Sequence, residues 1–188
     1  MVSLLMMNLE SRHLVMKYLE DFKEGQVIAL GTYPVSEEAI LQFGREFDTQ
    51  SFHTDPEAAK QSAFGGLIAS GWHTGSICMR LVCDTLLNQS ACNGSPGLRD
   101  LQWLKPVRPG DVLSGEVRIG EVKTSTSKPD RGSMLQHWLL KNQNNESVFS
   151  CNVVVLMMRG PSTGLEAWRS QAQNLWFSDG GCTGGKAE

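Results

Sequence analysis

The chain has 188 residues, of which 40% are hydrophobic and 19 more are glycine, so it can bury the core of one domain but is short for two. Its 17 Lys and Arg against 20 Asp and Glu give a net charge of −3, without the basic excess that binding to nucleic-acid phosphates requires. We therefore expect a single domain with no nucleic-acid partner.

The N-terminal region combines an arm with a first strand. Residues 1–25 mix apolar and charged side chains at helical spacing, and we expect residues 1–17 to form an arm that docks onto the domain or onto a partner subunit. Residues 27–33 are rich in β-branched side chains and stop at Pro34, which is typical of a short strand. The domain itself is expected to begin at about residue 18.

Two helix starts follow this strand. Ser36 precedes two glutamates, and its oxygen can accept a hydrogen bond from a first-turn N–H while the carboxylates favour the positive end of the helix dipole. The helix that begins there has one apolar stripe, made of Ile40, Phe43 and Phe47. Asp55 and Pro56 repeat the pattern of a capping residue and a first-turn proline, which predicts a short helix to residue 60.

The longest predicted helix begins after a glycine-rich approach. Residues 64–71 contain Gly65, Gly66 and Gly71, and residues 71–87 then run without a proline or a turn cluster. The apolar residues of this helix cover more than one narrow stripe, so we expect other elements to wrap it on most sides.

In the second half of the chain apolar residues recur at every second position, which is typical of β-strands. Turn-forming segments at residues 106–110, 128–132 and 142–145 divide this region into four strands. The alternating positions are Leu101 and Trp103; Val117 and Ile119; Leu135, His137 and Leu139; and Phe149, Cys151, Val153, Val155 and Met157. The order of elements predicts an α+β fold over residues 18–160, in which a curved antiparallel sheet wraps one long central helix. Residues 161–188 lack a core pattern and are expected to form a partly disordered extension.

The sequence gives no signal for a membrane, for secretion or for a metal. Apolar runs such as residues 153–158 fall far short of the roughly 20 residues that cross a bilayer, and the N-terminal residues lack the positively charged start of a signal peptide. The five cysteines are an odd number without a Cys-x-x-Cys pair, so they indicate neither a disulfide framework nor a zinc site. We expect a cytoplasmic protein whose cysteines pack as small apolar residues.

Asp48 and His53 are the first candidates for catalysis. They lie five residues apart between the two predicted helix starts, where a carboxylate and an imidazole could hold one water molecule. Hydration needs a base that takes a proton and an acid that delivers one, and Asp and His can divide these tasks near neutral pH. The spacing alone also fits a capping aspartate and a hydrogen-bonded loop histidine.

The start of the long helix offers a second catalytic feature. At Gly71 unpaired N–H groups and the positive end of the helix dipole face outward. Such N–H groups suit a thioester oxygen that becomes negative in an enolate-like transition state. The neighbouring glycines also fit a simpler role, a tight entry into a buried helix.

The loop around the Asp–His pair resembles a motif of the MaoC-like dehydratases, or R-specific enoyl-CoA hydratases, which have the hot-dog fold. Their hydratase motif, Asp-x-Asn-Pro-x-His-x-Asp, is matched by Asp48, His53 and Asp55. Gln50 and Ser51 take the places of the Asn and the Pro. Gln is one methylene longer than Asn, and Ser lacks the fixed φ of proline, but both ionisable partners are kept.

Two further segments strengthen the resemblance. Residues 63–71 look like the family's approach to its central helix, and residues 104–111 look like its connector between strands, so the resemblance covers about residues 18–160. It implies an acyl-CoA substrate with no further cofactor and no metal. It also implies a homodimer, or an assembly of dimers, because hot-dog sheets pair edge to edge and loops of the neighbouring subunit commonly complete the pocket.

The resemblance assigns roles to individual residues. Asp48 and His53 would form the catalytic pair, with the division of acid and base left open. The backbone N–H of Gly71 would bind the thioester oxygen, and Gln50 would orient the loop or the substrate. The other substrate-binding candidates are Phe52, Ser70 and Trp72, with Trp103 and Met79 as further residues that could line the cavity.

Other titratable residues suit structural roles better. His73 lies just inside the long helix, where we expect a buried or interfacial, hydrogen-bonded side chain. His137 falls within a strand and His13 within the N-terminal arm, while Cys78 and Cys83 fall on the long helix as packing residues. The basic residues that could reach the phosphates of CoA are Lys105, Arg108, Lys123 and Arg131.

The leading hypothesis is a lyase that reversibly hydrates a trans-2-enoyl-CoA to the (R)-3-hydroxyacyl-CoA, with the configuration implied by the resemblance. The first alternative is a thioesterase on the same fold, in which a carboxylate directs water at the thioester carbonyl. The second alternative is a non-catalytic acyl-CoA-binding subunit. The pairing of Asp48 with His53 favours hydration.

Overall fold

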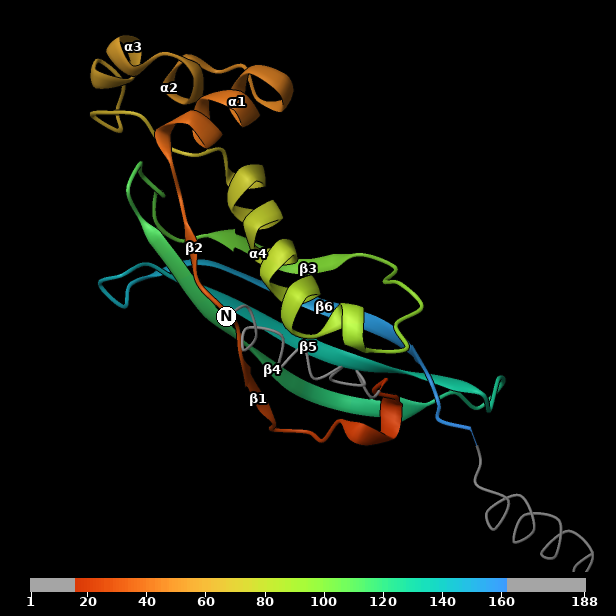
Figure 1. Ribbon diagram of the computed structural model, residues 1–188. Helices are drawn as coiled ribbons and strands as arrows, with labels where there is room; N and C mark the ends of the chain where they lie inside the picture. Colours follow the sequence, from red (N-terminus) through yellow and green to blue (C-terminus); the bar gives the residue numbers. More distant parts are fainter. Residues whose placement is uncertain (1–15, 162–188) are drawn as a thin grey trace, which may run out of the picture.

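A six-stranded antiparallel sheet and one long helix make up most of residues 16–161, the part of the chain that the computed structural model describes (Figure 1). The strands are β1 (Val27–Ala29), β2 (Tyr33–Pro34), β3 (Leu98–Trp103), β4 (Val112–Thr124), β5 (Arg131–Lys141) and β6 (Ser147–Met158). Their order is β1-β4-β5-β6-β3, and β2 also pairs with β4. Nearly all of the predicted N-terminal arm and C-terminal extension lie outside the described residues.

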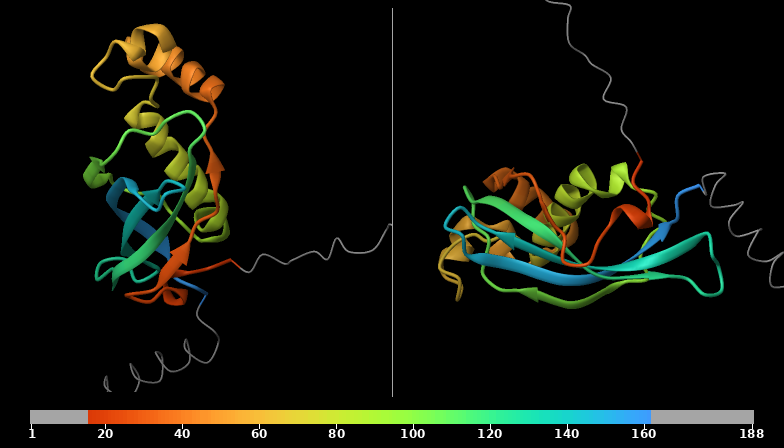
Figure 2. Two further views of the ribbon diagram at one scale, coloured as in Figure 1. Left: turned by 90° about the vertical axis from the view of Figure 1, so that its left-hand side faces the viewer. Right: turned by 90° about the horizontal axis from the view of Figure 1, so that it is seen from below.

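The helices lie on the sheet or at one end of it. They are α1 (Glu37–Phe47), α2 (Ser51–Thr54), α3 (Pro56–Lys60) and α4 (Gly71–Thr85), with single 3-10 turns at η1 (Leu19–Asp21) and η2 (Leu87–Gln89). Helix α4 crosses one face of the sheet, and α1 to α3 gather beyond its N-terminal end (Figures 1 and 2). This is the hot-dog fold, and the predicted α+β fold with a curved antiparallel sheet and one long central helix is confirmed.

The core lies between α4 and the sheet. On α4 the buried apolar residues are Ile77, Cys78, Leu81 and Val82. The opposite side of the helix stays open, because Trp72 is 58% exposed and Met79 is 41% exposed. The sheet and the N-terminal segments therefore cover most of α4 but leave one stripe uncovered.

The capping residues set the helix starts as predicted. The Ser36 hydroxyl accepts a hydrogen bond from the Ala39 N–H at 3.1 Å and begins α1. The Asp55 carboxylate accepts hydrogen bonds from the N–H groups of Glu57 and Ala58 and begins α3. The predicted loop between them contains one helical turn, α2, which carries His53.

Strand β5 shows the predicted alternation, but the opposite set of residues faces the core. Leu135, His137 and Leu139 lie on the face away from α4 and are half-buried. The buried set on β5 is Met134, Gln136, Trp138 and Leu140. Both sets contain large apolar side chains, so the sequence pattern alone did not determine which face is inside.

Two of the predicted strands differ from their predicted pattern. Residues 27–33 form the separate strands β1 and β2, because residues 30–32 bulge opposite only two residues of β4. On β3, Leu98 is 46% exposed and Trp103 is 50% exposed, because β3 is an edge strand that pairs only with β6 within the described chain. The apolar side chains of β3 are therefore available at the surface.

Candidate active site

Helices α1 and α2 bring the two predicted catalytic residues together. Asp48 caps the C-terminal end of α1, where its N–H donates to the Gly44 carbonyl at 2.9 Å. One turn later, α2 turns the His53 side chain back toward Asp48. The backbones of the two helices touch, since a Cβ atom at Gly44 would lie 2.6 Å from the His53 carbonyl oxygen. Glycine at position 44 thus allows the close approach that forms the pair.

The backbone fixes the proton position on His53. The imidazole is 5% exposed, and its Nδ1 atom lies 2.8 Å from the Ile68 carbonyl oxygen. A carbonyl only accepts hydrogen bonds, so Nδ1 carries a proton and donates it. In neutral His53 the lone pair is then on Nε2, which lies 3.4 Å from Asp48 Oδ2.

This arrangement favours a proton donor that lies beside the two facing atoms and reaches both. An ionised carboxylate and the unprotonated Nε2 atom of a neutral imidazole are both acceptors, so they gain nothing by facing each other directly. A water molecule that donates one hydrogen bond to each would satisfy both. The geometry therefore suits a water held and polarised by Asp48 and His53 together.

Two other donors hold the Asp48 carboxylate. The Ser70 hydroxyl donates to Oδ2 at 2.7 Å, and the Gln50 side-chain amide donates to Oδ1 at 2.9 Å. Burial raises the pKa of the Asp48 carboxyl, but the hydrogen bonds from Ser70 and Gln50 and the nearby His53 outweigh it and leave this pKa below its usual value. Asp48 is therefore ionised at neutral pH.

Ser70 has a different place from the one predicted for it. It is 1% exposed and does not line the cavity, so it is not positioned to bind substrate. Its hydroxyl accepts from the Trp72 N–H at 3.2 Å, which caps α4, while it donates to Asp48. Ser70 thus connects the start of α4 to the catalytic pair.

The N-terminus of α4 provides the N–H group expected at Gly71. Ser70 occupies the N–H of Trp72, whereas the N–H of Gly71 makes no hydrogen bond to any group in residues 16–161. The positive end of the α4 dipole lies at the same point. A carbonyl oxygen that gains negative charge beside Gly71 would find both a donor and a favourable field.

A cavity of about 410 Å³ joins these groups. Asp48, His53, Gly71 and Gln50 line it, as predicted for a common site. Its aromatic and cationic lining comes from Phe52, Phe64, Trp72, Trp103 and Lys105. Of the predicted lining residues, Met79 is absent from this cavity, because it lies on the open stripe of α4. The apolar walls next to an Asp–His pair suit an acyl group with a polar reacting end.

Sequence reasoning missed several members of the site, among them Ile68 and Thr74. The Ile68 carbonyl fixes the tautomer of His53, but a backbone contact across fifteen residues leaves no side-chain signal. Thr74 also lines the cavity. It lies three residues after Gly71 and therefore on the same face of α4, so helical spacing could have identified it.

Of the four basic residues that could reach the phosphates of CoA, one lines the cavity. Lys105 lines the cavity and pairs with Glu146. Arg108 donates to the Phe64 carbonyl at 2.7 Å, while Lys123 and Arg131 pair with Glu121 and Asp130 near the far hairpin.

Two histidines are explained by local packing. His73 is buried and stacks on Phe43 with the ring centroids 4.8 Å apart, and burial lowers the pKa of its imidazole. The predicted hydrogen bond of His73 is missing at Nδ1, which has no partner within the described chain. His137 lies on the outer face of the sheet, where its Nδ1 is 2.5 Å from Asn152 Oδ1. His13 lies outside the described residues.

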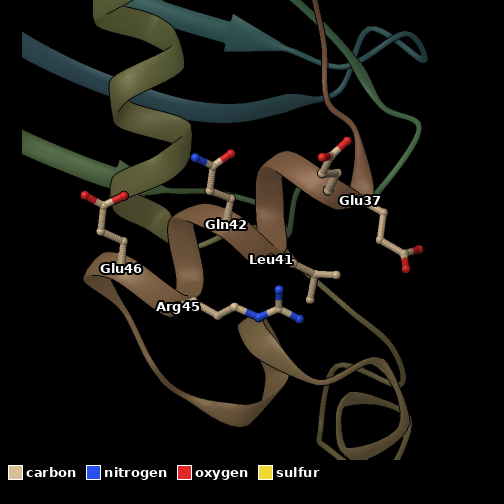
Figure 3. A pocket seen from close by; sticks show the side chains of 6 residues that line it. Glu37, Leu41, Gln42, Arg45 and Glu46 are labelled. Carbon is tan, nitrogen blue, oxygen red and sulfur yellow. The ribbon is translucent and has the colours of Figure 1, made fainter.

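A larger hollow of about 590 Å³ lies along α1 (Figure 3). Its lining residues are Glu37, Glu38, Leu41, Gln42, Arg45 and Glu46. It contains no histidine and no buried acid–base pair, so it lacks the groups that hydration needs. Among residues 16–161 no cluster of three His, Cys, Asp or Glu side chains is arranged to hold a metal, and no helix is long and apolar enough to cross a membrane.

Comparison with known proteins assigns the family. Residues 22–134 match the model of the MaoC-like domain. The chain is 29% identical over 141 residues to the uncharacterized protein YdeM of Bacillus subtilis (strain 168), covering 75% of this chain and 99% of that protein. The family match assigns the chain to the MaoC-like family. The fold, with an Asp–His pair beside the first turn of its central helix, agrees with this assignment.

One solved structure supports the same assignment, and a second shares the fold. The crystal structure of the MaoC-like dehydratase from Rhodospirillum rubrum is 39% identical with a TM-score of 0.72, covering 77% of this chain and 98% of that chain. The R-hydratase PhaJ1 from Pseudomonas aeruginosa is 20% identical with a TM-score of 0.62, covering 76% of this chain and 86% of that chain. The second likeness shows a shared fold.

Proposed function

We propose that the protein reversibly adds water to a trans-2-enoyl-CoA and forms the (R)-3-hydroxyacyl-CoA. The observation that carries this proposal is the approach of His53 Nε2 to within 3.4 Å of Asp48 Oδ2, in the same cavity as the Gly71 N–H, which is unpaired within residues 16–161. The family match and the likeness to a MaoC-like dehydratase support a hydratase or dehydratase.

The reaction follows from these groups. The water oxygen bonds to C3 of the enoyl group as one of its protons passes to the Asp48–His53 pair, and the electrons of the double bond move toward C2 and the thioester oxygen. The Gly71 N–H and the α4 dipole stabilise the charge on that oxygen. The pair then delivers a proton to C2, which leaves the catalytic groups as they began. The reverse sequence eliminates water.

The test is the loss of enoyl-thioester absorbance with a short and a medium trans-2-enoyl-CoA. We expect the native protein to hydrate at least one substrate, and Asp48→Asn and His53→Ala to lower kcat by about 10²-fold or more each, the usual contribution of a general acid or base. Asp130→Asn and His137→Ala are matched controls, because both residues lie away from the cavity. Full activity in both site variants would show that the reaction takes place elsewhere.

Two other outcomes would identify the alternative functions. Free thiol released from acyl-CoA without hydration would indicate a thioesterase. Thermal stabilisation by acyl-CoA without turnover of any enoyl substrate would indicate a non-catalytic binding subunit.

We also propose that two copies of the chain pair along β3. The outer edge of β3 is unpaired within the described chain, and two apolar residues of this strand, Leu98 and Trp103, are exposed. An unpaired edge strand with apolar neighbours is typical of a surface that is covered in the assembly.

A cytoplasmic location is proposed in addition, because the four cysteines within the described chain are free thiols.

A further inference from the structure

The indole of Trp103 lies directly against Gly71. A Cβ atom at position 71 would lie 2.4 Å from Trp103 Cε2 and 2.5 Å from Nε1, which is closer than side chains tolerate. The face of the indole, at the bond that its two rings share and beside its nitrogen, therefore rests on the first residue of α4. Glycine at position 71 makes this contact possible.

Two contacts hold this indole in place. The ring of Trp72 meets it edge to face, with centroids 5.5 Å apart and planes at 80°. At the end of β3, the backbone is attached to β6, because the N–H of Leu104 donates to the Val148 carbonyl at 2.9 Å. A donor on this ring is consequently preorganised, as a catalytic hydrogen bond requires.

The indole N–H of Trp103 is free to act as a donor. It makes no hydrogen bond to any group in residues 16–161, whereas the buried Trp138 donates its N–H to Gln136 at 2.7 Å. Trp103 is half-exposed and lines the same cavity as the catalytic pair. Gly71 and Trp103 thus both line the cavity, and each carries an N–H group without a hydrogen-bond partner among residues 16–161.

We infer that the Trp103 Nε1–H is a second donor to the thioester oxygen, beside the N–H of Gly71. This inference rests on the proposed hydration. A thioester oxygen that becomes negative can accept two hydrogen bonds, and a donor fixed by packing costs no reorganisation when the charge develops. The flat indole also covers one side of Gly71 and keeps water away from the oxygen.

The test removes the N–H group and keeps the ring. Trp103→Phe retains an aromatic wall without a donor, and replacement of Trp103 by benzothienylalanine retains the bicyclic shape with sulfur in place of N–H. We expect kcat for enoyl-CoA hydration to fall by about 10²-fold in both, the usual effect of losing one such donor, with a much smaller change in KM. Thermal unfolding checks that both proteins are folded.

The outcomes separate this inference from the proposed function. If benzothienylalanine at position 103 keeps the native kcat while phenylalanine does not, Trp103 acts only as a wall and the inference is wrong. The inference is also wrong if both variants keep the native kcat. If the native protein hydrates no enoyl thioester, the proposed function fails, and the donor assigned to its transition state fails with it.

Discussion

At the scale of single residues, the pKa of the Asp48 carboxyl is set by the groups that donate hydrogen bonds to it. Gln50 donates to Oδ1 and Ser70 to Oδ2, and together with His53 they keep the pKa of Asp48 low against the opposing effect of burial. Gln50 occupies the place of an Asn in the family motif, and its longer side chain donates from its amide to Asp48, two residues earlier in the chain. The departure from the motif thus keeps a donor at the site.

Removing the Gln50 donor should change the pH dependence of hydration. Gln50→Leu deprives the ionised Asp48 of one hydrogen bond, so the pKa of Asp48 rises and the carboxylate is lost at a higher pH as the solution is acidified. We expect the acid limb of the kcat/KM profile to move to higher pH. Gln143→Leu is the matched control, because Gln143 donates to Asp111 at 2.9 Å outside the cavity. Identical acid limbs in native and Gln50→Leu proteins would contradict the role given to Gln50.

The sequence alone predicts the ionisable residues of the site, but it does not predict the groups that form hydrogen bonds with them. Asp48 and His53 stand in one short motif, so the spacing placed them together. Ser70 lies 22 residues from Asp48, and its hydroxyl meets the carboxylate only because α4 starts beside the end of α1. Such tertiary contacts, like that of the Ile68 carbonyl with His53, have no local pattern from which they could be predicted.

At the scale of elements, the site depends on how closely α1 approaches α2. Gly44 is buried where the two helices touch, and a Cβ atom there would be 2.6 Å from the His53 carbonyl oxygen and 3.1 Å from its carbon. Both atoms belong to the backbone, so no side-chain rotation can relieve the overlap. A larger residue must move α2, and with it the imidazole of His53.

Gly44→Ala should therefore destabilise the protein and reduce hydration. Overpacking typically costs about 1–3 kcal/mol of unfolding free energy, which here exceeds the gain that alanine brings to a helix interior. Gly75→Ala on α4 is the control, since its Cβ would meet Phe149 at an ordinary 3.7 Å and should stabilise the protein by about 0.5–1 kcal/mol. Urea unfolding and hydration rates check both. A Gly44→Ala protein as stable and active as Gly75→Ala would contradict the packing argument.

The helices and strands also show which features of the fold a local sequence pattern does not determine. Capping residues determined the starts of α1 and α3, because their hydrogen bonds are local. The alternation on β5 predicted a strand but not its inner face, since Leu135 and Leu139 on the outside are as apolar as Met134 and Leu140 on the inside. Which face is buried depends on where α4 lies, and that is a property of the assembled fold.

At the scale of the whole molecule, the two edges of the sheet differ. One edge is formed by the short strands β1 and β2, whereas the other is β3, a strand of six residues with no partner beyond β6 in the described chain. Leu98 pairs in register with the buried Val153, so it lies on the face that carries α4, yet it is 46% exposed. Residues 16–161 cover this apolar end of β3 only in part, and a second copy would cover the rest.

A charge on β3 should separate the two copies. Leu98→Lys places a cation at the edge, and burying it in a dimer would require removing it from water without a partner. We expect sedimentation to give a dimer for the native chain and a monomer for Leu98→Lys. The matched control is Leu156→Lys, because Leu156 is 39% exposed but lies on the outer face of the sheet, opposite Ser133 of β5. A dimer that survives Leu98→Lys and dissociates with Leu156→Lys would place the interface on the outer face, and a native monomer would exclude a homodimer altogether. Because Trp103 at the end of β3 also lines the cavity, separation of two copies along β3 would expose this wall, so Leu98→Lys should lower the rate of hydration as well as the mass of the particle.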